Sequence, residues 1–90
     1  MPSIIKFVEL QKGDFLYKKG DESLCFYFVL RGKLELLVDN IHTTDSEFKF
    51  SKNVDESEFF GLRTDPRNDY ARVVTDSGCE ILAISRDYYE

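Results

Sequence analysis

Apolar and polar residues alternate with a period of two over much of the chain, and short turn sequences interrupt the alternation. This period is typical of β-strands that face a core on one side, because successive side chains of a strand point to opposite faces. The pattern predicts strands at residues 15–17, 24–30, 33–38, 48–50, 71–75 and 79–84, with a short apolar segment at 59–60. We therefore expect a mainly β fold, an antiparallel β-roll of the jelly-roll kind.

The clearest local prediction is a β-hairpin that joins residues 24–30 to residues 33–38 through the turn at 31–32. Residues 24–30 are almost all apolar, which is typical of a strand covered on both faces. In the second strand, three positions are expected to face inward and two outward, respectively Leu34, Leu36, Val38 and Lys33, Glu35. Four phenylalanines are expected to belong to the core: Phe26, Phe28, Phe48 and Phe50.

Short helical segments are expected only near the two ends of the chain. Residues 4–10 are long enough for a short helix, and Ser85 is suited to N-cap a helical turn over residues 86–90. The polar stretches at residues 39–47 and 51–58, and the Pro66-containing stretch at 62–70, are predicted to be irregular connections.

Composition and charge narrow the function classes. A chain of 90 residues has room for one hydrophobic core, so residues 1–90 are expected to form a single domain. An apolar content of 42% excludes a disordered chain, and no apolar run approaches the about 20 residues of a membrane span. The net charge of −5 disfavours nucleic acid as a partner and direct membrane insertion. Two cysteines do not make a disulfide scaffold, which suggests a cytoplasmic location.

No residue pattern indicates catalysis, a metal site or a cofactor, so we expect a protein that is not an enzyme. His42 is the one histidine of the chain, and it lies in a polar stretch without a cysteine nearby in the sequence. A cupin-like jelly-roll enzyme is the alternative from a different class, but it requires a cluster of histidines and carboxylates. Cys25 and Cys79 are expected to be buried free thiols.

The order of turns and strands resembles the cyclic nucleotide-binding domain, the β-roll of protein kinase A regulatory subunits, nucleotide-gated channels and bacterial catabolite activators. The resemblance rests on a series of glycine turns and aromatic strands, followed by a final apolar strand. The matching segments are Lys12-Gly13-Asp14, Phe15-Leu16-Tyr17, Gly20-Asp21, residues 26–29, Gly32, Phe60-Gly61, Ala71-Arg72-Val73 and residues 81–87. The resemblance covers about residues 7–89 and implies a regulatory domain that senses cAMP or cGMP.

In that family, a phosphate cassette binds the nucleotide, with the pattern Phe-Gly-Glu, a short helix and Pro-Arg-x-Ala-x-Val. The Gly lets backbone amides approach the cyclic phosphate, the Arg binds the phosphate oxygens and the Glu accepts from the ribose hydroxyl. Here Leu62 occupies the Glu position, and alignment on the Ala-x-Val pair places Asp69 at the Arg position. Pro66 and Arg67 preserve the Pro-Arg pair in a shifted position.

The resemblance therefore implies a degenerate cassette, with weak or no nucleotide binding and a role exerted through a protein partner or a fused effector domain. The alternative is a functional cAMP- or cGMP-binding domain that uses Arg67 after a rearrangement of the loop. The candidate ligand-binding residues in either case are Gly61, Leu62, Arg63, Arg67, Tyr70, Ala71 and Arg72.

Structural roles remain open for the same residues. The three arginines could pair with Asp65, Asp69 and Asp76 on a solvated surface, and Tyr70 could pack at a strand start with its hydroxyl in water. The family also carries helices after the roll that cover the base of the nucleotide. Because residues 85–90 are barely longer than one helical turn, we expect the chain to be a segment that lacks these lid helices.

Overall fold

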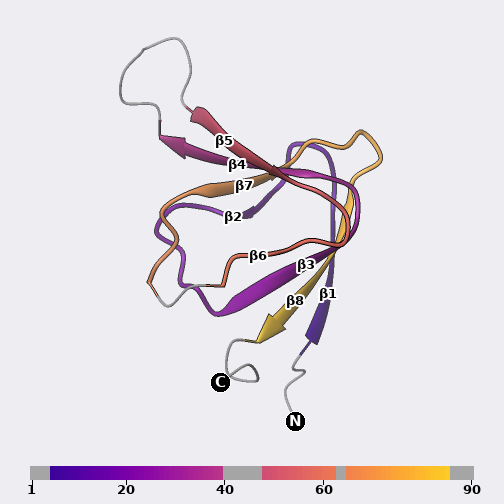
Figure 1. The fold of residues 1–90 in the computed structure, drawn as a ribbon, viewed down its shortest axis with the longest axis horizontal. Helices are drawn as coiled ribbons and strands as arrows, with labels where there is room; N and C mark the ends of the chain where they lie inside the picture. Colours follow the sequence, from indigo (N-terminus) through magenta and orange to yellow (C-terminus); the bar gives the residue numbers. More distant parts are fainter. Residues whose placement is uncertain (1–4, 40–47, 63–64, 86–90) are drawn as a thin grey trace.

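A computed structural model describes residues 5–39, 48–62 and 65–85 (Figure 1). These residues form eight β-strands and no helix, so the described part contains no helix able to cross a membrane. The strands are β1 (Ile5–Leu10), β2 (Phe15–Tyr17), β3 (Cys25–Arg31), β4 (Leu34–Asp39), β5 (Phe48–Val54), β6 (Phe59–Phe60), β7 (Tyr70–Val73) and β8 (Cys79–Ser85). The helical turn predicted over residues 86–90 lies outside the described residues.

The strands form two four-stranded sheets, with the orders β1-β8-β3-β6 and β2-β7-β4-β5. Every strand pair is antiparallel. Figure 1 shows the two sheets as separate layers that meet on one side of the molecule. The mainly β, antiparallel roll predicted from the alternating pattern is confirmed.

The hydrophobic core lies between the two sheets and receives side chains from both. Alternation along each strand selects these side chains, because every second residue of a strand points to the same face. The buried core cluster consists of Tyr17, Val29, Leu34, Val54, Ala71, Val73, Cys79 and Ile81. These residues come from six strands, so the core ties together all but the edge strands β1 and β6, whose side chains pack around it.

The predicted hairpin between residues 24–30 and 33–38 is wrong. β3 pairs with β8 and β6, whereas β4 pairs with β5 and β7 in the other sheet. The intervening Gly32 has a φ of 95°, and a Cβ placed on it would lie 2.6 Å from the carbonyl oxygen of Gly78. The chain therefore crosses from one sheet to the other directly beneath the turn between β7 and β8. This crossing lets both Val29 and Leu34 be fully buried between the sheets.

The inward facing predicted for Leu34 and Leu36 is confirmed, and Leu37 is buried on the opposite face of the sheet. Leu34 is buried and Lys33 is exposed, as expected. The register against β5 shifts between Leu36 and Leu37, and Leu37 is buried whereas Leu36 is half-buried. The extra residue of this irregularity is Ser51 of β5, so the alternation along β4 continues: Leu36 lies opposite buried Ala71 and Leu37 lies opposite Tyr70. Glu35 is half-buried rather than exposed.

Three further expectations, two about secondary structure and one about the core, are wrong. Residues 5–10 form β1, paired along its whole length with β8, and not a helix. β5 continues to Val54, four residues beyond the predicted strand, because these residues pair with β4. The four phenylalanines assigned to the core point away from it: Phe50 is 55% exposed, and Phe26, Phe28 and Phe48 are half-buried outside the core cluster.

Candidate functional site

The segment that joins β6 to β7 corresponds to the predicted cassette, and its described part starts at Gly61. This glycine has a φ of 84°, a conformation that residues with a side chain rarely adopt. A Cβ at this position would lie 3.0 Å from Arg67 Nη1 and 3.0 Å from Tyr27 Cδ2. The absence of a side chain at Gly61 therefore lets the Arg67 guanidinium lie directly against the backbone.

Arg67 is the buried cation of the site, with only 2% of its surface exposed. Its Nη1 donates a 2.6 Å hydrogen bond to the carbonyl oxygen of Gly61, and its Nη2 donates a 2.6 Å bond to the carbonyl oxygen of Cys25. Its Nε is buried without a hydrogen-bond partner. Within the described residues, no carboxylate forms an ion pair with this guanidinium. The charge is thus compensated by carbonyl dipoles rather than by an acidic side chain.

Two tyrosine rings form the walls around the Arg67 guanidinium. The guanidinium carbon lies 4.4 Å from the centroid of Tyr17 and 5.4 Å from that of Tyr27. The two rings are stacked, with centroids 6.0 Å apart. Such contacts between a cation and a ring face stabilise a desolvated guanidinium by electrostatic attraction to the π-electrons. Arg67 therefore belongs to the packed interior between the sheets.

Asp69 also contacts this buried group. Burial raises the pKa of the Tyr17 hydroxyl, and the negative charge of Asp69, together with its hydrogen bond to the hydroxyl, raises it further, whereas Arg67 acts in the opposite direction. Burial likewise raises the pKa of Tyr27, and Arg67 lowers it. Both tyrosines therefore remain neutral at physiological pH. The carboxylate at the position of the family's arginine is engaged by a tyrosine of the fold.

Backbone hydrogen bonds fix the Arg67 segment against the loop between β2 and β3. The Arg67 amide donates a 2.8 Å bond to the Asp21 carbonyl, and the Gly20 amide donates a 2.8 Å bond to the Arg67 carbonyl. The Ser23 hydroxyl also donates to the carbonyl of Asp65. These bonds fix the backbone amide and carbonyl of Arg67. The guanidinium is therefore positioned by the backbone as well as by its own contacts.

Arg72 lies on the opposite face of the β2-β7-β4-β5 sheet, away from Arg67. Ala71 and Val73 are buried, and Arg72 points away from them because successive side chains of a strand alternate between its faces. Its guanidinium forms an ion pair with Glu35, with Nη2 2.5 Å from Oε1. It also lies 5.9 Å from the Phe15 ring. Arg72 is therefore paired on an outer surface, although its partner is Glu35 rather than one of the aspartates considered from the sequence.

Tyr70 lies on the same outer face and packs in an aromatic cluster. Its ring lies 4.7 Å from that of Phe48 and 6.1 Å from that of Phe15. Its hydroxyl donates a 2.9 Å hydrogen bond to Asp39. The pKa of Asp39 is lowered, first by its hydrogen bond from Lys19 and then by the one from Tyr70. These contacts correspond to the packing role of Tyr70, with the hydroxyl bound to a carboxylate.

The structure thus divides the candidate residues into separate places. Gly61 and Arg67 lie together between the sheets, and Ala71 is part of the core. Tyr70 and Arg72 lie on the outer face of one sheet, and the Leu62 side chain is 53% exposed. Arg63 lies outside the described residues, as does His42. Within the described part, no group of three or more His, Cys, Asp or Glu residues is placed to hold a metal ion.

The sequence profile of the cyclic nucleotide-binding domain matches residues 7–90, almost the entire chain. The chain belongs to the cyclic nucleotide-binding domain family. This confirms the resemblance drawn from the glycine turns and aromatic strands. No curated protein sequence matches the chain.

Solved structures show the same β-roll. The catabolite activator protein of Thermus thermophilus superposes with a TM-score of 0.79 and 23% identity, over 96% of this chain and 40% of that chain. The regulatory domain of Toxoplasma gondii PKA, crystallised with cAMP, has a TM-score of 0.80 and 24% identity, over 96% and 32%. The sensor domain of the regulator DNR from Pseudomonas aeruginosa has a TM-score of 0.79 and 19% identity, over 94% and 57%. This member of the family therefore spans 32–57% of these longer chains.

Reasoning from sequence missed the partners of Arg67. These partners lie 40 or more residues earlier in the chain: the rings of Tyr17 and Tyr27 and the carbonyl of Cys25. Alternation along a strand does not indicate such distant contacts. The sequence pattern assigns Phe26 and Phe28 to the core, whereas the structure turns Tyr27 and Val29 inward on the other face of β3. The inward orientation of Tyr17 depends on a register irregularity between Phe15 and Tyr17 in the pairing of β2 with β7. No local signal marks that irregularity.

Proposed function

We propose that this domain is a non-enzymatic regulatory module that binds cAMP and cGMP weakly or not at all and acts through contacts with a protein partner or a fused effector domain. The internal engagement of Arg67 carries the proposal. Its two terminal nitrogens donate to the carbonyls of Gly61 and Cys25, and its guanidinium contacts the rings of Tyr17 and Tyr27. The guanidinium is held inside the fold by these contacts, so a phosphate would have to reach its remaining N–H groups within the packed interior.

The two side chains at the remaining cassette positions support the same proposal. Leu62 is exposed and apolar, so it offers no acceptor to a ribose hydroxyl. Asp69 carries a negative charge close to Tyr17, which disfavours a phosphate in that neighbourhood. Each lost charge-assisted hydrogen bond costs about 1.5–3 kcal/mol, so two losses lower affinity by about a thousandfold.

The test is isothermal titration calorimetry with cAMP and with cGMP on the wild-type chain and on the paired variant Leu62→Glu with Asp69→Arg. We expect no measurable binding by the wild type and measurable binding by the paired variant, because the variant restores an acceptor and a cation. Thermal unfolding of both proteins controls for loss of the fold. Tight wild-type binding would overturn the proposal.

The alternative function is a nucleotide-binding domain with a shifted cassette, and the contact between Arg67 and Gly61 is the observation that favours it. In that case, the wild type binds cAMP or cGMP at low micromolar concentration and Arg67→Lys loses most of this affinity, because lysine lacks the two-pronged donor geometry. A matched Arg72→Lys variant, whose arginine pairs with Glu35 on the outer surface, is expected to leave nucleotide affinity unchanged.

A further inference from the structure

The outer face of the β1-β8-β3-β6 sheet is apolar although it points away from the core. Register places its side chains in rows that run across the strands: Ile5 lies opposite Ile84, which lies opposite Phe26. The next row lies two positions further along β1, β8 and β3, and it consists of Phe7, Leu82, Phe28 and Phe59. We call these seven residues the outer apolar face.

This outer apolar face is accessible at both of its edges. Ile5 is 49% exposed, Phe7 is 53% exposed and Phe59 is 62% exposed. Phe7 and Phe59 each leave on the order of 100 Å² in contact with water, since a buried aromatic side chain covers about 150–250 Å². Phe59 packs edge-on against Phe28, with ring centroids 4.6 Å apart, so the rings form one continuous surface. Contiguous apolar surfaces of this size mark sites of interaction.

A row of charged residues closes one end of the outer apolar face. Glu9 lies directly opposite Glu80, and Glu80 lies opposite Arg31. Arg31 Nε is 3.2 Å from Glu80 Oε1, so the single cation of the row is engaged by one of its two carboxylates. No ion pair among residues 5–39, 48–62 and 65–85 includes Glu9. Like charges directly opposite each other on two strands are destabilising. A cation from a partner placed beside Glu9 would offset this repulsion.

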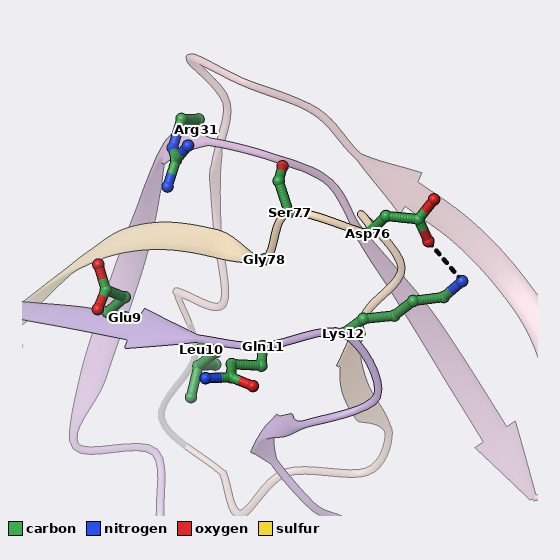
Figure 2. Close-up of a pocket in the computed structure, with 8 residues that line it drawn as sticks. All are labelled: Glu9, Leu10, Gln11, Lys12, Arg31, Asp76, Ser77 and Gly78. Atoms are coloured by element: carbon green, nitrogen blue, oxygen red, sulfur yellow. Dashed lines mark hydrogen bonds and ion pairs between the residues drawn. The ribbon is translucent and has the colours of Figure 1, made fainter.

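Figure 2 shows that Glu9 and Arg31 border a pocket between the end of β1 and the turn before β8. The pocket has a volume of about 380 Å³, and Ser77 and Gly78 form part of its wall. Lys12 also borders it, but its ammonium group is engaged with Asp76 at 2.6 Å, as the dashed line in Figure 2 indicates. The pocket is therefore large enough for the end of a long basic side chain and presents the Glu9 carboxylate to it.

We propose that the outer apolar face binds an amphipathic helix of a protein partner, and that a lysine or arginine of this helix enters the pocket beside Glu9. The proposal rests on the proposed function, in that it specifies the protein contact through which the domain acts. A helix of about 10–12 Å diameter covers about three strands spaced 4.7–4.9 Å apart. The charged row lies four residues along the strands from the Ile5 row, which is about 13 Å or about nine residues of a helix.

Charge favours a basic partner over a second copy of this chain. Each copy carries a net charge of −5, and a copy placed face to face would bring its own Glu9 and Glu80 toward the same surface. Like-charge contacts of this kind disfavour association. A partner helix with apolar residues at three- and four-residue intervals and a basic residue about nine positions along satisfies both parts of the surface.

The test uses a fluorescein-labelled peptide of about 18 residues, built from alanine, leucine and lysine, with one leucine stripe and its lysines at one end. A second peptide carries glutamate in place of the lysines. Fluorescence anisotropy measures the binding of each to the full 90-residue chain. We expect the lysine peptide to bind at least about tenfold more tightly than the glutamate peptide, and Glu9→Gln to remove most of this difference. Glu22→Gln, which changes an exposed glutamate away from the charged row, is the matched control.

Substitutions on the apolar surface provide the second part of the test. Phe7→Ser and Phe59→Ser are each expected to weaken the lysine peptide about tenfold, whereas Phe50→Ser is expected to have no effect. Phe50 is 55% exposed but lies in β5 of the other sheet, so it controls for general loss of apolar surface. Equal effects of the three substitutions, or equal binding of the two peptides, would overturn the proposal. So would a dimer in analytical ultracentrifugation that Phe7→Ser dissociates, because the occupant would then be a second copy.

Nucleotide titration of the same preparation separates this proposal from the proposed function. Tight binding of cAMP by a chain that also discriminates between the peptides would defeat the degenerate cassette and leave the docking face standing. A chain that binds neither nucleotide nor peptide would defeat the docking face alone.

Discussion

Replacing Arg67 with alanine is expected to destabilise the domain far more than the same change at Arg72. The Arg67 guanidinium donates two hydrogen bonds of 2.6 Å to backbone carbonyls and lies 4.4 Å from the Tyr17 ring centroid. A hydrogen bond from a charged donor contributes about 1.5–3 kcal/mol, and its loss leaves a buried carbonyl unpaired. Alanine also relieves the cost of burying the charge, so we expect a net loss of about 3 kcal/mol. Arg72→Ala is expected to cost less than about 1 kcal/mol, because its ion pair with Glu35 is partly exposed.

Urea unfolding followed by tyrosine fluorescence and by circular dichroism measures these losses, since the chain contains no tryptophan. Arg67→Lys provides an intermediate case: it keeps the charge and loses the two-pronged geometry, so part of the stability should return. The typical unfolding free energy of a small domain, about 5–15 kcal/mol, leaves the Arg67→Ala variant folded enough for measurement. If Arg67→Ala cost no more than Arg72→Ala, the guanidinium would not be a structural element, and the reasoning behind the proposed function would fail.

Three other outcomes follow from the packing. Gly32→Ala should destabilise the domain more than Gly20→Ala. Both glycines have a φ of 95°, but of the two only Gly32 would bring the added Cβ against a backbone oxygen, at 2.6 Å. Equal shifts in the thermal unfolding temperature would contradict the crossing between sheets. Leu34→Ala should lower the free energy of unfolding in urea by about 2–5 kcal/mol, and Leu36→Ala should lower it less, since Leu34 is fully buried and Leu36 is half-buried. The opposite order would contradict the register of β4. Burial raises the pKa of Cys79 from 9.0 to about 11, so stability present below pH 9 should fall between pH 9 and pH 11 as the unfolded thiol ionises first. The slope due to this thiol is at most about 1.4 kcal/mol per pH unit. Cys79→Ala should remove the thiol's share, which is clearest between pH 9 and pH 10, because the raised pKa values of Tyr17 and Tyr27 add to the fall above pH 10. An unchanged pH profile in that variant would refute the assignment.

The positions of most strands could be predicted from sequence, because alternation and turn residues are local signals. The strand at residues 15–17 has the predicted bounds, and the strand at 79–84 is one residue longer than predicted. The pairing of strands could not be predicted in the same way. A short turn at residues 31–32 is equally compatible with a hairpin and with a crossing between sheets, because both place apolar residues on alternate positions. What decides between them is the approach of the β7–β8 turn to Gly32, which involves residues almost 50 positions away.

The candidate site was predictable to a similar extent. The Pro-Arg pair drew attention to Arg67, and the family pattern identified the substitutions at Leu62 and Asp69. The burial of Arg67 was not visible, because its partners come from β2, β3 and the loop between them. The expectation that Cys25 and Cys79 are free thiols is confirmed, although only Cys79 is fully buried. Long-range contacts of this kind depend on pairing, which a pattern within one strand does not contain.

Alternation along β3 connects the two surfaces on which the proposals rest. Tyr27 and the carbonyl of Cys25 contact the Arg67 guanidinium, whereas Phe26 and Phe28 point to the outer apolar face. β3 therefore has the cassette on one side and the docking face on the other, separated by the thickness of a single strand. Because packed interiors transmit displacement, a helix that presses on the outer rings acts on the same backbone that accepts from Arg67. For the proposed docking, this arrangement provides a physical route by which a protein contact changes the segment between β6 and β7.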